Sequence, residues 1–361
     1  MISMTAKRID DFDFIKGCLI LFVVWGHFCM YLSGTDYEKN LFTTYIRLFQ
    51  MPLFIFISGF FQKPVFGRIQ AVKKVLKSIK HIAIPMVSWT VLVYVAKLLL
   101  NKSNYNGLGY FIEQTHGIVS LFWYLGCLLM CLFLYTAISL CQNLNKLLGY
   151  FFFLVSIFMM TMVNVKIFHF SFLWIFFCLG LYTKYVLNNT SLLKQIPKWI
   201  EIIVVIILMI TVLLLGYQYE TCWTFYNADN CVFTHDSGWN SEILFVVYRY
   251  FIYIATTFCS FYLLKKLYSV IKNTRIAAVI VSLGKETLFI YVSHVAFLSL
   301  FAHPVIVLIT ADNVVMQDSP IIRYYLICTI CTIVLVVILF FISTLIKKHI
   351  PSISKFLLGN S

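Results

Sequence analysis

Long apolar stretches recur along this chain of 361 residues, and most are long enough to cross a lipid bilayer. A hydrocarbon layer about 30 Å thick requires about 20 apolar residues in a helix. Charged residues make up only 12% of the chain, whereas soluble domains average about 25%. Such a chain cannot cover itself with groups that water solvates. Because helices satisfy their own backbone hydrogen bonds in lipid, the sequence predicts an all-α polytopic membrane protein.

The apolar stretches predict about ten transmembrane helices in a single bundle. No Pro/Gly/Ser-rich linker divides the chain, so residues 1–361 are expected to form one integral-membrane domain. The predicted spans are 14–32, 44–61, 82–100, 121–140, 147–163, 168–186, 200–216, 243–264, 283–302 and 324–346.

The charge pattern predicts the orientation of these spans. If the N-terminus lies in the cytoplasm, the inner segments hold most of the 28 basic residues, and the outer loops collect acidic residues. Lys and Arg are enriched in cytoplasmic loops of membrane proteins, so both termini are expected to be cytoplasmic. The net charge of +14 therefore requires no nucleic-acid partner.

One inner segment is more basic than orientation demands. Residues 67–81 place Lys73, Lys77 and Lys80 at helical spacing beside apolar residues. This pattern is typical of a helix that rests on anionic membrane lipid. It equally fits a cradle for an anionic cytoplasmic ligand such as a nucleotide phosphate, and the sequence leaves both interpretations open.

Titratable groups inside apolar spans are candidates for function, because burying a charge in lipid costs about 2.5–3.5 kcal/mol on insertion scales. The chain carries five of them in or near its spans: Lys16, His27, Arg47, Arg249 and His294. Lys16 and Arg47 are close enough to span ends for their charged groups to reach the membrane interface. The two histidines cannot do so, which leaves either a functional role or a neutral imidazole bonded to a neighbouring helix. For Arg249 a structural ion pair competes with a role in the site.

Lys16 and His27 share one face of the first predicted span. Eleven residues separate them, which corresponds to a rise of about 16 Å and an offset of about 20° around the helix. Asp13 lies one turn before Lys16, where an i,i+3 ion pair can orient the lysine. An anionic ligand held at Lys16 could extend a thin arm to His27, whose neutral imidazole is suited to accepting a proton.

The remaining chemistry-bearing residues are less informative. The eight histidines are scattered, and no metal-ligand spacing occurs, so we expect no metal. Eight of the eleven cysteines lie inside apolar runs. Cys222 and Cys231 fall in a polar loop. The sequence leaves two alternatives for them, a disulfide or two free thiols.

Several motifs together resemble the membrane-bound acyltransferase-3 family. RIDDFDFIKGCLILFVVWGH (8–27) is similar to that family's opening signature, a Lys or Arg before Gly with a His further in. FQMPLFIFISGFF (49–61), which contains Ser58, and LFWYLGCLL (121–129), which contains Trp123, resemble its second and fourth spans. SLGKETLFIYVSH (282–294), with Lys285 and His294, resembles its Gly-Lys-x-Thr-Leu…His element.

The resemblance implies an acetyl-CoA-dependent O-acyltransferase, similar to sugar O-acetylases of the fucose 4-O-acetylase type. Such enzymes move an acetyl or other acyl group from cytoplasmic acyl-CoA to a hydroxyl of a carbohydrate or lipid-linked glycan. It implies a multi-pass protein of the bacterial plasma membrane. It further implies that His27 is the catalytic base and that Lys16 contacts the CoA phosphates. Asp13, Arg47, Ser58, Trp123, Arg249, Lys285 and His294 would support the site or line its acceptor side.

Two positions depart from the family pattern. Gln50 stands where many relatives have His, and the cytoplasmic Arg-x-x-Arg pair appears as Lys77 and Lys80, followed by His81. Lysine retains the charge but lacks the bidentate fork of arginine. We carry acyl-CoA binding over to Lys77, Lys80 and His81 on this basis.

A glycan or lipid transporter is the alternative function, and a scaffold for envelope assembly is a third. A transporter would use the same polar residues along a path, but the chain lacks an internal repeat and paired Gly/Pro-broken spans. A scaffold would not need intramembrane histidines. The outer loops 101–119 and 217–242 contain aromatic and polar residues that could bind sugar, but the acceptor cannot be identified from them.

Overall fold

The computed structural model describes residues 10–33, 41–100, 122–162, 169–189, 198–218, 239–310 and 321–350, and all of its regular elements there are helices. The first half contains α1 (Asp10–Ser33), α2 (Leu41–Phe60), α3 (Gly67–Ser78), α4 (Ile84–Leu100), α6 (Trp123–Leu144) and α7 (Lys146–Met162). The second half contains α8 (Phe170–Asn189), α9 (Lys198–Gln218), α10 (Trp239–Ile271), α11 (Arg275–Lys285), α12 (Thr287–Thr310) and α13 (Ile321–His349). The predicted all-α class is confirmed for this part of the chain.

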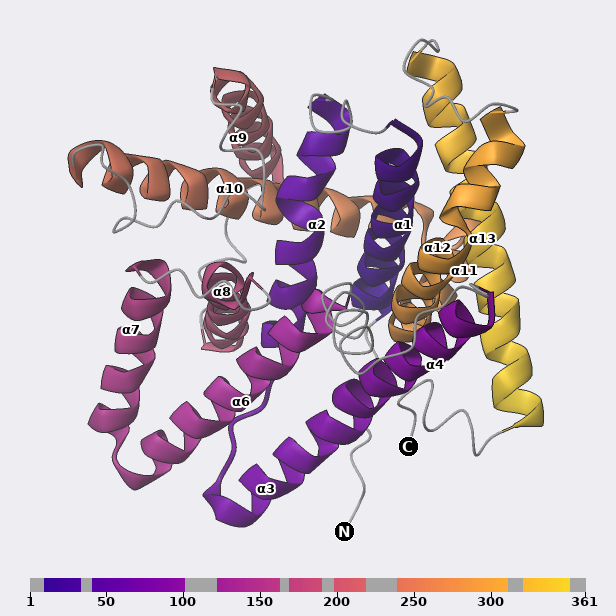
Figure 1. Ribbon diagram of the computed structural model, residues 1–361. Coiled ribbons are helices and arrows are strands. Elements are labelled where there is room, and N and C mark those ends of the chain that lie inside the picture. Colours follow the sequence, from indigo (N-terminus) through magenta and orange to yellow (C-terminus); the bar gives the residue numbers. More distant parts are fainter. Residues whose placement is uncertain are drawn as a thin grey trace.

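Helix α1 occupies the centre of the structure. It contacts α2, α10, α11, α12 and α13, and α2 in turn packs on α8 (Figure 1). Two side-chain hydrogen bonds join α1 to α13: Trp25 Nε1 donates to Thr329 Oγ1 at 3.2 Å, and Tyr324 Oη donates to the Cys29 carbonyl at 2.6 Å. Interhelical hydrogen bonds of this kind contribute about 0.6 kcal/mol each in membrane proteins. Most residues of α1 are therefore held in the interior.

Glycines allow the two closest helix contacts. A Cβ on Gly17 of α1 would lie 2.1 Å from the Ile280 carbonyl oxygen of α11, and one on Gly284 would lie 1.7 Å from that of Asp13. Gly59 and Gly180 make the same kind of contact between α2 and α8. Because small residues let helix backbones approach closely in lipid, the glycines after Lys16 and before Lys285 have a packing role.

Apolar side chains also cover much of the outer surface. Large hydrophobic residues are exposed along α4, α7, α9 and α13, for example Leu99, Phe151, Ile207 and Val337. Monomeric soluble proteins rarely expose large apolar patches. The pattern agrees with helices whose outer faces contact lipid.

Four helical segments are long and apolar enough to cross a membrane, within the described residues. They are Asp10–Leu32, Gly67–Leu99, Trp123–Leu144 and Tyr324–His349, and the bent pair α11–α12 could add a fifth. Four predicted spans fall on shorter apolar helices, Tyr45–Phe60, Lys146–Met160, Phe170–Tyr185 and Trp199–Ile210. The count of ten spans and the cytoplasmic placement of both termini stay predictions.

Two predicted elements have different boundaries in the structure. The basic segment 67–81 continues without a break through a π-helical turn, Ile79–Ala83, into α4. The predicted ninth span, 283–302, is not straight, because α11 ends at Lys285 and α12 leaves at an angle of 76°.

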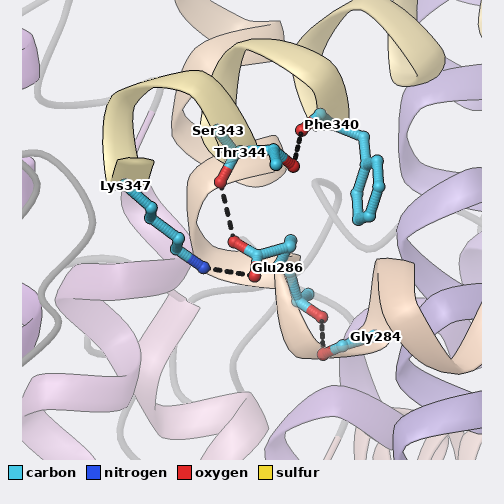
Figure 2. Close-up of polar contacts among 7 residues, drawn as sticks. Gly284, Glu286, Phe340, Ser343, Thr344 and Lys347 are labelled. Carbon is cyan, nitrogen blue, oxygen red and sulfur yellow. Dashed lines mark hydrogen bonds and ion pairs between the residues drawn. The ribbon is translucent and has the colours of Figure 1, made fainter. Parts of the chain in front are cut away.

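The corner between α11 and α12 is fixed by polar contacts at Glu286 (Figure 2). Its carboxylate accepts a hydrogen bond from Ser343 Oγ at 2.8 Å and pairs with Lys347, both on α13. Thr287 Oγ1 donates to the Gly284 carbonyl at 2.6 Å. A carboxylate inside a straight apolar span would lack such partners, so the bend lets Glu286 reach the basic end of α13.

Candidate functional site

His27 lies in the interior on α1, with its side chain partly exposed, and it meets a second histidine. The ring centroids of His27 and His294, on α12, are 5.1 Å apart, and the ring planes are inclined by 72°. The structure thus brings together two residues that the sequence marked in separate spans. Arg47 of α2 lies within electrostatic range of His27.

His294 is completely buried, at 0% exposure. Its Nδ1 lies 2.8 Å from the carbonyl oxygen of Ile290, one turn earlier on the same helix. A carbonyl oxygen only accepts, so Nδ1 carries the hydrogen in the neutral ring and Nε2 carries the lone pair. Nε2 is buried, and no described residue bonds to it. Nδ1 thus bonds within α12 and not to a neighbouring helix, which was one of the two alternatives that the sequence left open.

Aromatic rings continue from the histidine pair toward α6 and α2. Tyr291 stands 5.8 Å from His294, Tyr124 of α6 stands 5.5 Å from Tyr291, and Phe54 of α2 stands 5.8 Å from Tyr124, all between ring centroids. The hydroxyl of Ser58, one turn beyond Phe54, donates to the Phe54 carbonyl at 2.9 Å. These rings make one wall of the histidine site rigid and apolar.

Lys16 and Asp13 form the predicted i,i+3 ion pair. Lys16 Nζ lies 2.6 Å from Asp13 Oδ1, and the lysine side chain remains 30% exposed. Lys285 lies at the same end of α1, with its Nζ 3.9 Å from Asp10 Oδ1. Lys16 is therefore oriented and accessible, about 16 Å along the helix from His27.

A basic pocket of about 530 Å³ opens beside this end of α1. Its polar lining consists of Gln62, Lys63, Gln70, Lys74, Lys77, Ser78 and His81, and no carboxylate lines it among the described residues. Phe61, which also lines it, packs edge-on against Phe12 of α1 with centroids 4.8 Å apart. The pocket therefore lies at the same end of α1 as Lys16.

The pocket includes only part of the predicted acyl-CoA set. Lys77 and His81 line it, whereas Lys80 and Lys16 do not. His81 lies four residues after Lys77, and side chains at this spacing share one face of a helix.

Three further lysines at this pocket were missed by motif analysis. Lys63 and Lys74 line it, and Lys74 Nζ approaches the Lys63 carbonyl at 3.5 Å and the Tyr135 ring centroid at 4.3 Å. Lys184 of α8 donates to the Gln62 carbonyl at 2.7 Å. Lys74 could have been included from the basic run 67–81, whereas no sequence signal places Lys184 here.

The other predicted site residues are distributed around the bundle. Arg47, expected to reach the membrane interface, is instead buried at 8% exposure, because α2 packs between α1, α8 and α10. Arg249 is also buried, and its guanidinium lies 4.5 Å from the Phe172 ring centroid, a cation–π contact between α10 and α8. Trp123 packs edge-on against His169 at 5.2 Å. Gln50 is partly buried, and no described residue bonds its Oε1.

The described residues form no metal site, and the predicted loop cysteines and most of the predicted sugar-binding loops lie outside them. Among these residues, no group of three or more His, Cys, Asp or Glu side chains is arranged to hold a metal ion. Cys222, Cys231, loop 101–119 and most of loop 217–242 lie outside the described residues.

Comparisons with known proteins give one family match and two related sequences. The acyltransferase-domain model of the acyltransferase-3 type matches residues 9–342. The nodulation protein NolL of Mesorhizobium japonicum is 23% identical over 292 residues, covering 80% of this chain and 76% of that protein. The NolL protein of Sinorhizobium fredii is 26% identical over 178 residues, covering 48% of each chain. No solved structure shows significant similarity.

Proposed function

The chain belongs to the acyltransferase-3 family, whose members are membrane acyltransferases, and we propose that it transfers an acetyl group from acetyl-CoA to a hydroxyl of a cell-envelope carbohydrate. One observation carries this proposal beyond the family assignment. A partly exposed histidine on the central helix lies about 16 Å along that helix from a partly exposed, oriented lysine, and a basic pocket opens at the lysine's end of the helix.

The donor fits this arrangement because acyl-CoA combines several phosphates with a long, thin arm that ends in a thioester. Lys77 and His81 in the pocket, with Lys16 beside it, would bind phosphate oxygens. Charge-assisted hydrogen bonds of this type contribute about 1.5–3 kcal/mol each. The arm would then follow α1 to bring the thioester to His27.

The reaction follows from placing a neutral imidazole beside the thioester and a hydroxyl. His27 takes the proton of the acceptor hydroxyl as its oxygen attacks the thioester carbonyl. The tetrahedral intermediate collapses with cleavage of the carbon–sulfur bond. The CoA thiolate then takes the proton from His27, which gives the acetyl ester and free CoA and restores the base.

The acceptor is proposed from the sequence resemblance, since the outer loops lie outside the described residues. A sugar hydroxyl would reach His27 from the membrane face opposite the basic pocket, which separates donor entry from acceptor entry. With the N-terminus in the cytoplasm, the donor would enter from the cytoplasmic side of a bacterial plasma membrane.

Radiolabelled acetyl-CoA and the purified protein in detergent test this function. Labelled acetyl transfer to methyl fucoside or to bacterial cell-envelope glycans, with release of free CoA, is expected for the wild type. His27→Ala should lose at least 100-fold in rate, because general-base catalysis contributes about 10²–10⁴-fold. His349→Ala, on the exposed end of α13, is the matched control and should retain wild-type activity.

Two outcomes would refute the proposal. Equal turnover by wild type and a folded His27→Ala variant would exclude His27 as the base. Glycan movement across proteoliposomes without CoA binding or acetyl transfer would instead establish the transporter.

A further inference from the structure

The tautomer of His294 is fixed by its own helix. The Ile290 carbonyl takes the Nδ1 hydrogen at 2.8 Å, so Nε2 must act as the acceptor atom of the ring. That nitrogen is fully buried and no described residue bonds to it. Leaving a buried acceptor without a partner costs about 1–3 kcal/mol, so its retention here requires a reason.

Of the ring contacts that His294 makes among the described residues, the shortest is with His27. The two imidazoles are in edge-to-face contact at 5.1 Å between centroids. Tyr291 also contacts His294, with ring centroids 5.8 Å apart, and Tyr124 packs against Tyr291. His294 is fully enclosed while His27 is partly exposed, so His294 lies behind the proposed base as seen from the accessible side.

We infer that His294 is a positioning residue for His27: its Nε2 accepts the ring N–H of His27 and leaves the other His27 nitrogen free as the base. This inference rests on the proposed function of His27. A neutral imidazole has one N–H and one lone pair, so fixing the direction of one hydrogen bond decides which nitrogen takes the substrate proton. A base held by a third group is the usual arrangement for proton abstraction in such sites.

The same contact acts during the reaction. When His27 takes the hydroxyl proton it becomes an imidazolium with two N–H groups. His294 Nε2 holds one of them, and the second proton passes to the CoA thiolate. The two rings are not hydrogen-bonded in the structure, as is common for catalytic pairs before substrate is bound. Donor binding would bring them together.

A pair of variants with similar side-chain volume separates acceptor chemistry from packing. In His294→Gln, the amide oxygen can accept at the position of Nε2, whereas His294→Met fills the space without an equivalent acceptor. We expect His294→Met to lower kcat about 10–100-fold, the effect of losing one hydrogen bond to a charged group, with the KM for acetyl-CoA unchanged. His294→Gln should recover at least half of that loss on a logarithmic scale.

Wild-type protein provides a second measurement that does not depend on variants. Nitrogen-15 chemical shifts of the histidine rings, assigned with His27→Ala and His349→Ala, report which nitrogen carries hydrogen. His294 is expected to show a protonated Nδ1 and an unprotonated Nε2. A hydrogen on Nε2 would overturn the inference even if every His294 variant failed to fold.

The kinetic outcomes distinguish this inference from the proposed function. If His27→Ala is inactive but His294→Gln and His294→Met lose activity equally, the function stands and the positioning role is wrong. An increase in KM alone would likewise exclude it, since it would place His294 in donor binding. If wild-type protein transfers no acetyl group, the proposed function itself fails.

Discussion

Replacing Gly284 with alanine should separate two helices that carry the proposed site. The added Cβ would lie 1.7 Å from the Asp13 carbonyl oxygen, and Cβ contacts under 3.0 Å essentially never occur. The gap must therefore widen by at least 1.3 Å, the difference between these distances. The obstacle is backbone rather than a flexible side chain, so the start of α1 must move as a unit.

The expected magnitude follows from this displacement. Overpacking of a close contact typically costs about 1–3 kcal/mol, so Gly284→Ala should lower stability without preventing folding. Asp13 also orients Lys16, with their side chains 2.6 Å apart. Because a misplacement of about 1 Å can lower a rate about 10²-fold, we expect kcat/KM for acetyl-CoA to fall about 100-fold.

Thermal unfolding in detergent and acetyl transfer measure the two effects separately. Val279→Ile is the control, because it adds one carbon on the exposed face of the same helix and should change neither quantity. A Gly284→Ala protein with wild-type stability and more than half of the wild-type kcat/KM would refute the reasoning from close backbone contact.

Three further changes test other parts of the structure. Lys77→Ala should raise the KM for acetyl-CoA about 10-fold, as expected for one charge-assisted contact. Lys80→Ala should change this KM less than twofold, and equal increases in KM for the two variants would contradict the assignment of the pocket. Glu286→Gln should lower stability in detergent by about 2 kcal/mol, because it leaves Lys347 without its charged partner. Adding Lys347→Met should restore part of this stability, and a double variant without any recovery would exclude the explanation. Trp174→Phe removes the donor of the 3.1 Å hydrogen bond to Ser156 Oγ. It should lower stability by about 1 kcal/mol and leave kcat unchanged. A lower kcat would contradict this prediction and link the contact to the site.

Local patterns in the sequence predicted local structure well. The ion pair of Lys16 and Asp13 follows from helical spacing alone, and the all-α class follows from apolar runs with little charge. Both depend on residues close together in the chain, where the geometry of a helix is known in advance.

Contacts between distant elements could not be predicted in this way. The burial of Arg47 depends on which helices surround α2, and Lys184 reaches the Gln62 carbonyl only because α8 packs on α2. The bend at Glu286 depends on partners in α13. Spacing within one helix carries no information on these neighbours, so the sequence marked Lys77 and His81 but not the lysines beside them.

The bend at Glu286 explains how one chain segment can make two different contacts with α1. Gly284 contacts the backbone of Asp13, and His294 contacts His27. On α1 these partners are fourteen residues apart and lie within about 40° of one another at 100° per residue. On a continuous helix, Gly284 and His294 would be offset by about 80°, and the face that packs closely on α1 would direct His294 away from His27. Breaking the helix between them frees α12 to rotate independently, so the glycine contact and the histidine pair can form together.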